Sequence, residues 1–197
     1  MMFPSRVGGQ TTQQVGFFAC DHREFAKWLT EGFEPGWATL DPRWGSIDDV
    51  VETLTPMPVL NRYACIGLDG WTLLMSNGPM GTDVGVLPSY AARELKCRGI
   101  RAVRVDDDES GYPARILEVF GPAGRPPLER SVAAVKDGDR WVFEASGTPL
   151  AFEDEATYRR RPKSSRLTGE MIHDYLLALG VPVDSEPNWR TAVLIQK

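Results

Sequence analysis

The fold is decided by residues 62–76, whose sequence is RYACIGLDGWTLLMS. Two β-rich, mostly apolar runs, 62–68 and 71–76, flank the dipeptide Asp69-Gly70. Asp-Gly supplies the positive φ angles that a two-residue hairpin turn needs. The stretch therefore predicts a β-hairpin and makes an antiparallel sheet the starting point for the fold.

Other strands follow the same pattern along the chain. The run 131–136 is joined to 140–146 by the turn residues Asp137-Gly138-Asp139, which predicts a second hairpin. A third is expected where two β-rich runs flank an acidic turn that contains Gly and Pro, at 100–105 and 115–120. Short apolar runs predict a first and a last strand at 15–20 and 191–195.

Capping residues predict the helices. Asp21 and Glu24 have capping-box spacing and open a helix that ends at Gly32. Ser46 with Asp49 opens a short helix over 47–54. Three more are expected: one N-capped by Ser89, one with Glu153–Glu155 in its first turn and Arg159–Arg161 in its last, and one capped by Thr168.

The fold class predicted from these elements is α+β. We expect a largely antiparallel sheet of about six to eight strands, with four to five helices packed mainly on one face. The sheet is mixed if the connection through the Ser89 helix places 71–76 and 100–105 side by side in parallel. Residues 1–14 are expected to form a mobile tail and residues 15–197 a single α+β domain.

Composition and charge limit the classes of function that the chain can have. The chain has 197 residues with 22 basic and 27 acidic side chains, a net charge of −5. This balance argues against general nucleic-acid binding and suits solubility or attraction to a basic protein. No apolar run reaches the 18 residues typical of a membrane span, so a cytoplasmic protein without membrane contact is expected. Three widely spaced cysteines, Cys20, Cys65 and Cys97, fit reduced thiols better than a disulfide framework.

Catalytic and metal-binding patterns are scarce. The chain has two histidines, and Cys20 with His22 straddles a strand-to-helix junction, a spacing that does not define a nucleophile pair. His173 with Asp174 are adjacent helix residues that do not face each other. No metal-ligand motif occurs, and the acidic run 106–109 lacks calcium-loop spacing. We therefore expect no cofactor, no metal and no catalytic residue, which favours a binding protein over an enzyme.

A glycine-rich loop, residues 77–85, offers an alternative. It follows a strand and precedes a helix, where backbone N–H groups can bind an anion. It matches neither of the common phosphate-binding motifs. The alternative function is therefore a small ligand-binding or enzymatic domain for an anion or nucleotide, using Asn77, Gly81, Thr82, Asp83 and Ser89.

Four segments in this order carry a resemblance: GWTLLM at 70–75, GTDVGVLPS at 81–89, RWVFEASG at 140–147, and 168–180 continuing into Val-Pro. Over residues 60–195 the chain resembles uncharacterised bacterial proteins, some of them similar to immunity proteins of polymorphic or contact-dependent toxin systems. The resemblance implies no catalytic residue. It implies an intracellular protein that binds and neutralises a toxin.

Charge and resemblance together predict a non-enzymatic protein-binding protein, most sharply an immunity protein that occludes a basic toxin domain with acidic loops. The residues expected to contact the partner are Asp106, Asp107, Asp108, Glu109, Asp137 and Asp139. A structural subunit of a larger assembly is a third class that the sequence leaves open.

Overall fold

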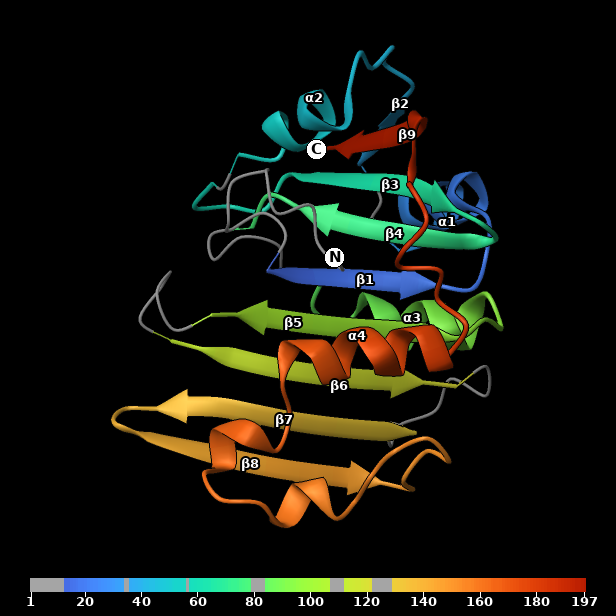
Figure 1. Cartoon of the computed structure of the whole chain (residues 1–197). Helices are drawn as coiled ribbons and strands as arrows, with labels where there is room; N and C mark the ends of the chain where they lie inside the picture. Colours follow the sequence, from blue (N-terminus) through green and yellow to red (C-terminus); the bar gives the residue numbers. More distant parts are fainter. Residues whose placement is uncertain (1–12, 34–35, 56, 79–83, 107–111, 122–128) are drawn as a thin grey trace.

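A computed structural model describes residues 13–33, 36–55, 57–78, 84–106, 112–121 and 129–197. Its framework is one open, antiparallel sheet of nine strands in the order β2-β9-β3-β4-β1-β5-β6-β7-β8 (Figure 1). The predicted α+β class and the antiparallel pairing are confirmed.

The strands are β1 (Gln14–Phe18), β2 (Ala38–Leu40), β3 (Arg62–Leu68), β4 (Trp71–Ser76), β5 (Gly99–Val105), β6 (Ala114–Phe120), β7 (Arg130–Asp137), β8 (Arg140–Gly147) and β9 (Asn188–Gln196). The helices are α1 (His22–Trp28), continued by the π-helical turn η1 (Leu29–Phe33), α2 (Ile47–Glu52), α3 (Leu87–Glu94) and α4 (Gly169–Ala178). Two short 3₁₀ turns, η2 (Thr157–Arg159) and η3 (Lys163–Ser165), precede α4.

All three predicted hairpins are present. In the first, β3 pairs with β4 around Asp69 and Gly70, both of which have positive φ. In the third, β5 pairs with β6. The second, β7 with β8, turns more tightly than the sequence suggested, because Asp137 already pairs with Arg140 and only two residues form the loop.

Strand β1 lies at the centre of the sheet. It pairs antiparallel with β4 on one side and with β5 on the other. Strands β4 and β5 therefore run in the same direction, as the α3 connection suggested, but β1 separates them. Every observed pairing is consequently antiparallel, and the mixed sheet does not form.

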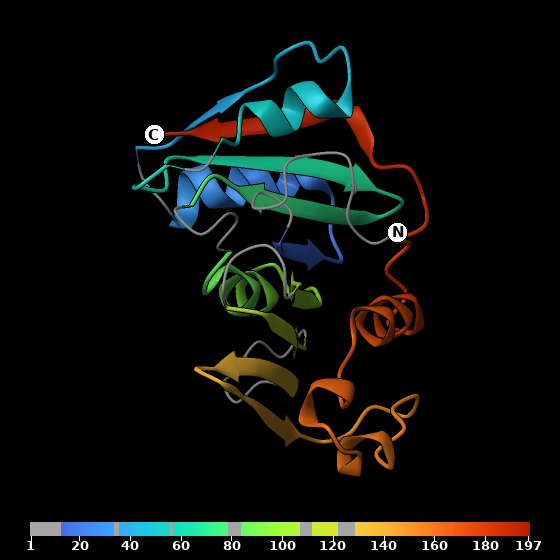
Figure 2. The same cartoon turned by 60° about the vertical axis from the view of Figure 1, so that its left-hand side comes forward.

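The helices are divided between the two faces. One face, turned toward the reader in Figure 1 and called the front face here, carries α2 and α4 over a core that includes Phe17, Ile66 and Leu117. The back face carries α1 and α3 over a core that includes Phe18, Phe25 and Leu74. Figure 2 shows α4 and the 3₁₀ turns on one side of the sheet and α3 on the other. The arrangement differs from the predicted one-faced packing because both sides of the central strands are apolar.

Three predicted helix caps are confirmed, whereas the predicted cap of α3 and the helix predicted from Glu153 are wrong. Asp21, Ser46 and Thr168 cap α1, α2 and α4, with a full capping box at Ser46. Ser89 does not cap α3, which begins two residues earlier with Pro88 in its first turn, where a missing N–H costs nothing. The helix expected from Glu153 onward is replaced by the 3₁₀ turn η2, because Glu153 is held in a buried ion pair.

Two further differences from the predictions concern strand β2 and the start of β1. The three exposed residues of β2 were not predicted. At the N-terminal end, Gln14 belongs to β1 and Gln13 is buried, so ordered structure begins inside the predicted tail. Residues 1–12 lie outside the described part of the chain.

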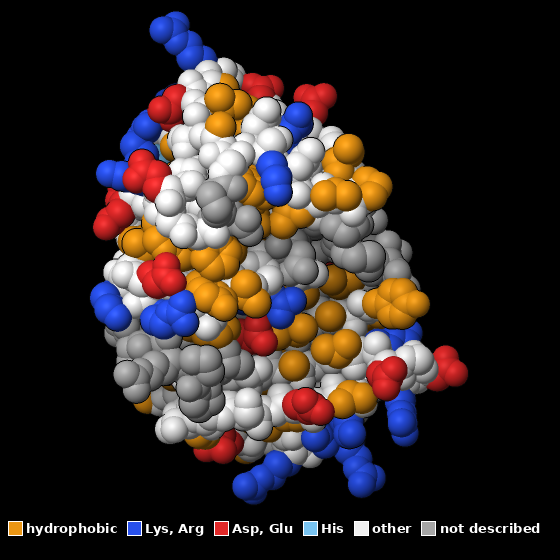
Figure 3. All heavy atoms as spheres, turned by 180° about the vertical axis from the view of Figure 1, so that it is seen from behind, with side chains coloured by type: hydrophobic (Ala, Val, Ile, Leu, Met, Phe, Trp, Pro, Cys, Tyr) orange, Lys and Arg blue, Asp and Glu red, His pale blue; other side chains and the backbone are white. Residues whose placement is uncertain are grey.

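The back of β5–β8 carries apolar side chains away from the helices. Val103, Val105 and Ala114 form a small cluster there, with Ile116 and Val135 packed against it. Figure 3 shows hydrophobic side chains in a hollow of this surface. Among the described elements, α3 is the helix that contacts β5 and β6 on this side. None of the described helices is long and apolar enough to cross a membrane.

Candidate functional site

A cavity of about 320 Å³ opens on the front face between α2 and the connection from α4 to β9. We call it the front pocket. Its lining residues come from five elements and that connection: Phe17, Ile47, Leu68, Leu73, Val183, Asp184, Ser185, Glu186, Pro187 and Trp189.

The floor of the front pocket is apolar because of strand alternation. Phe17 of β1 lies directly opposite Leu73 of β4, so both side chains point to the same face. Leu68 ends β3 beside them, and each of the three is less than one-tenth exposed. Ile47, in the first turn of α2, packs against the same core. The sheet thus supplies a rigid hydrophobic base.

The rim of the front pocket is acidic. Asp184 and Glu186 lie on the connection that follows Val183, and both are exposed. Glu186 accepts a hydrogen bond from the indole Nε1–H of Trp189, 3.2 Å long. Asp184 Oδ1 lies 2.8 Å from Nε2 of His173 on α4. An ionised carboxylate only accepts, so His173 donates and ties the rim to the helix.

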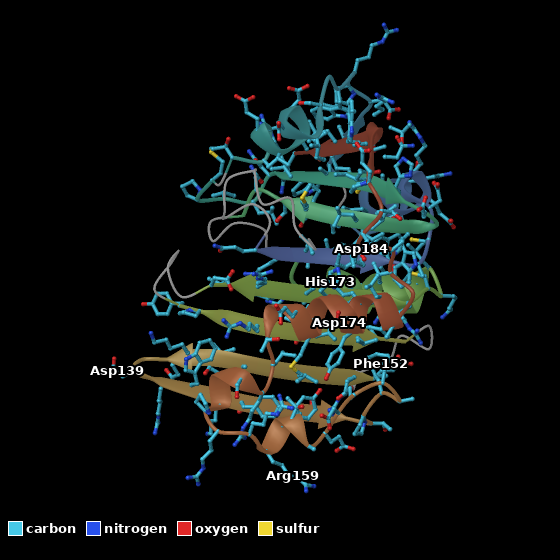
Figure 4. All side chains as sticks on the ribbon, in the orientation of Figure 1. Asp139, Phe152, Arg159, His173, Asp174 and Asp184 are labelled. Atoms are coloured by element: carbon cyan, nitrogen blue, oxygen red, sulfur yellow. The ribbon has the colours of Figure 1, made fainter. Side chains whose placement is uncertain are left out.

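Figure 4 labels the three polar residues on this side of the pocket. His173 projects from α4 toward Asp184, and Asp174 follows it on the same helix. Asp174 Oδ1 is 3.4 Å from Nδ1 of His173, so these adjacent residues are in contact and the expectation that they do not face each other is wrong. His173 lies between two carboxylates, and its contact with Asp184 through Nε2 holds the exposed connection on α4.

Trp189 forms the end of the pocket nearest β9. The guanidinium of Arg190 lies over its ring, 4.8 Å from the centroid. The indole is thus fixed by Glu186 at its edge and by Arg190 at its face. An apolar base with a fixed aromatic wall and two carboxylates at the mouth suits a group that is apolar at one end and cationic at the other.

The acidic residues predicted to contact a partner differ in their surroundings in the structure. Asp106 forms ion pairs with Arg104 at 3.1 Å and Arg115 at 3.9 Å, so its charge is compensated within the fold. Asp137 and Asp139 are exposed at the β7–β8 turn, where Figure 4 labels Asp139. The register brings Asp106 and Asp137 to the same end of the sheet. The remaining three, Asp107, Asp108 and Glu109, lie outside the described residues.

The alternative ligand site is described only in part. Asn77 is buried, and its side chain accepts from the N–H groups of Asn61 and Arg62 and donates to Asn61 Oδ1. The side chain is therefore used to hold the chain before β3. Ser89 lies within α3, and the other residues of that prediction, Gly81, Thr82 and Asp83, lie outside the described residues.

The other histidine, His22, contacts β9 and the cap of α1. His22 Nε2 donates to the carbonyl oxygen of Thr191 at 3.0 Å, and its Nδ1 lies 3.6 Å from Asp21. No group of three or more His, Cys, Asp or Glu residues is arranged to hold a metal ion among the residues described.

Two other cavities are more polar. One, of about 400 Å³, lies between Arg104, Arg115 and the start of α4, and Asp106 pairs with both arginines there. Another, of about 380 Å³, contains the Arg23–Asp41 ion pair. Sequence reasoning missed the front pocket because its parts are far apart in the chain. The one local signal was the acidic, proline-bounded segment 182–187 between a helix and an apolar strand.

Comparison of the chain with protein-family models, with curated proteins and with solved structures finds no match.

Proposed function

We propose that this chain binds a basic protein partner through the front pocket, most sharply as an immunity protein that neutralises a toxin. The observation that supports the proposal is the combination of an apolar floor with two exposed carboxylates at the mouth. The net charge of −5 adds long-range attraction for a basic partner. In this proposal the function is one of binding, without chemistry.

The anchor that best fits the pocket is a Lys or Arg side chain. The methylene stem of such a residue packs on Phe17 and Leu73, while its cationic end meets Asp184 or Glu186 at the rim. A buried anchor with a charged rim is the usual arrangement of an interface hot spot. The charges speed the encounter, and the apolar contact slows dissociation.

The test uses a defined partner, the product of the reading frame beside the gene. Its binding to the purified chain is measured by titration calorimetry, and the double variant D184N/E186Q is compared with D137N/D139N at the β7–β8 turn. Both changes remove two exposed carboxylates, so the net charge is matched. We expect the pocket variant to weaken binding about tenfold or more and to reduce its salt dependence.

Three results would count against the proposal. A larger loss of affinity in D137N/D139N than in D184N/E186Q would place the interface at the β7–β8 turn, as predicted from the sequence. Loss of binding in I116E, on the back face of β6, with normal binding by D184N/E186Q would place the interface on the back of the sheet. No binding at all, together with no rescue of growth when the neighbouring product is expressed, would remove the neutralising function.

A second candidate is a small ligand in the same pocket. A volume of about 320 Å³ lies at the lower end of the range for small-molecule sites. The chemistry favours an apolar amine over the anion expected from loop 77–85. A thermal-shift panel of aromatic amines, nucleotides and phosphorylated metabolites separates the two, because a ligand at 100 times its Kd adds about 2.7 kcal/mol of stability. No shift with any amine would exclude this candidate.

A further inference from the structure

Two cysteines meet at the end of the central β1–β5 ladder. The last pair of the ladder is Phe18 with Gly99. One step further, the N–H of Ala19 donates to the carbonyl of Arg98 at 2.9 Å. Cys20 and Cys97 each lie one residue beyond this hydrogen bond, just past the end of the ladder. Cys20 turns there and donates its own N–H to the carbonyl of Phe18 at 2.8 Å.

The two sulfurs are in contact. The thiol of Cys20 is hydrogen-bonded to Cys97, which raises the pKa of Cys20, and burial raises it further. The same hydrogen bond lowers the pKa of Cys97. Both side chains belong to the back-face core, Cys97 as a buried member and Cys20 at its partly exposed border. The pair is thus close together and reachable from one side.

We propose that Cys20 and Cys97 form a reversible disulfide when the protein meets a peroxide. The proposal rests on the contact between their thiols beside the Ala19–Arg98 hydrogen bond and is independent of the front pocket. One of the two thiolates attacks hydrogen peroxide and becomes a sulfenic acid as hydroxide leaves. The other thiolate attacks that sulfur, the S–S bond forms, and a second hydroxide leaves. Two thiols lose two electrons and two protons, and peroxide is reduced to two waters.

The contact between the thiols favours a disulfide, because the two sulfurs that must bond already share a hydrogen bond. The bond would join the entry of α1 to the segment between α3 and β5. It would close a loop of roughly 80 residues, which restricts the unfolded chain strongly.

Cys65 provides an internal control. It lies on β3, and β4 separates that strand from β1. The Cys65 side chain is completely buried, and that burial raises the pKa of its thiol. Its ladder partner on β4 is Leu74, which in turn pairs with Gly16 of β1, four residues from Cys20. Cys65 should therefore stay reduced while the other two react.

The experiment treats the folded, reduced protein with hydrogen peroxide and counts thiols after unfolding. We expect the count to fall from three to one and to return to three with dithiothreitol. Trypsin should yield residues 7–23 linked to the dipeptide Cys97-Arg98, with Cys65 free in residues 63–93. The disulfide form should melt on the order of 10 °C higher.

Neither C20S nor C97S should give the linked peptide: the variant that keeps the attacking cysteine should stop at the sulfenic acid, and the other should keep both remaining thiols. The same oxidation in concentrated urea should give a mixture of pairings in which those of Cys65 are prominent, because they close shorter loops. The contrast with the folded protein shows that the fold directs the pairing. In the folded protein, a link that involves Cys65, disulfide-linked dimers, sulfinic acids in place of the linked peptide, no loss of thiols, or a melting temperature that does not rise would each overturn the proposal.

Discussion

Arg130 and Glu153 form an ion pair in which the side chains are only 4% and 1% exposed. The guanidinium donates from Nε to Glu153 Oε1 at 2.9 Å and from its Nη2 to Oε2 at 2.6 Å. Its remaining nitrogen, Nη1, donates to the carbonyls of Ser146 and Gly147. The pair therefore fixes the segment that follows β8 onto β7, close to the point where that segment turns toward α4.

Removal of one partner of the Arg130–Glu153 ion pair should lower the free energy of unfolding substantially. In Glu153→Ala the guanidinium stays buried without its carboxylate, and loss of one member of a buried pair costs about 3–5 kcal/mol. Urea denaturation should show this loss in the free energy of unfolding. Glu155→Ala is the matched control, because Glu155 is exposed two residues away and its loss should change stability by less than about 0.5 kcal/mol. Equal effects of the two changes would mean that the pair adds little.

The hydroxyl of Tyr158 should contribute less to the free energy of unfolding than the carboxylate of Glu153. Its hydroxyl donates to Glu153 Oε2 at 2.7 Å and lies 3.2 Å from the hydroxyl of Tyr175 on α4. Tyr158→Phe keeps the ring but leaves both oxygens short of a partner, so we expect a loss of about 1–2 kcal/mol by the same denaturation. A Tyr158→Phe/Glu153→Ala double variant should lose less than the sum of the single losses, since the two groups share one hydrogen bond. Strict additivity would contradict this network.

The ion pair also predicts a pH dependence. Burial raises the pKa of Glu153, but hydrogen bonds from Arg130, from the Leu150 N–H and from Tyr158 outweigh it, and the pKa lies below its ordinary value. A carboxyl group with a lowered pKa in the folded state stabilises above its unfolded pKa of about 4.3 and loses that contribution as the pH falls through the folded value. The stability gap between wild type and Glu153→Gln should therefore be constant from pH 6 to 8 and shrink below about pH 4. A gap that widens in acid would show the opposite shift.

Glu153 also shows why the sequence pattern did not predict the conformation of this segment. Three acidic residues in a row before three arginines predict a helix with charges at its ends, and that logic is local. The partner that decides the conformation, Arg130, lies 23 residues earlier, and no local pattern indicates it. The caps at Asp21, Ser46 and Thr168 were predictable because their hydrogen bonds join residues two or three positions apart. The hairpins were predictable because each has turn residues between two neighbouring β-rich runs.

The position of β1 and the front pocket were not predictable for the same reason. Strand β1 enters between β4 and β5, which follow it by more than fifty residues, and this insertion keeps those two parallel strands from pairing. The pocket joins Phe17 to Trp189 across almost the whole chain. The acidic contact residues were predicted from charge alone, and the structure shows that two arginines compensate the charge of Asp106.

The cap of α1 offers a local test on the back face. Asp21 accepts hydrogen bonds from the N–H groups of Arg23 and Glu24 at 2.9 and 3.1 Å. Asp21→Ala leaves these donors to solvent and should cost about 1 kcal/mol of unfolding free energy, whereas Asp21→Ser or Asp21→Asn should cost only a few tenths. Thermal unfolding of the three variants at neutral pH checks the order. If all three lose the same amount, the effect comes from the charge of Asp21 and not from its capping bonds.

Gly99 tests how closely α3 approaches the sheet. A Cβ on Gly99 would lie 2.4 Å from the backbone oxygen of Pro88, in the first turn of α3, and backbone cannot rotate away as a side chain can. Gly99→Ala should therefore push the helix outward and cost about 1–3 kcal/mol, the range for overpacked cores. Gly32→Ala is the control, because its Cβ would lie 3.7 Å from Trp28, an ordinary contact. Since α3 and β5 both border the back-face core, hydrogen exchange should show the loss there first, in the amides of α3. Unchanged stability in Gly99→Ala would mean that α3 lies farther from β5 than the structure places it.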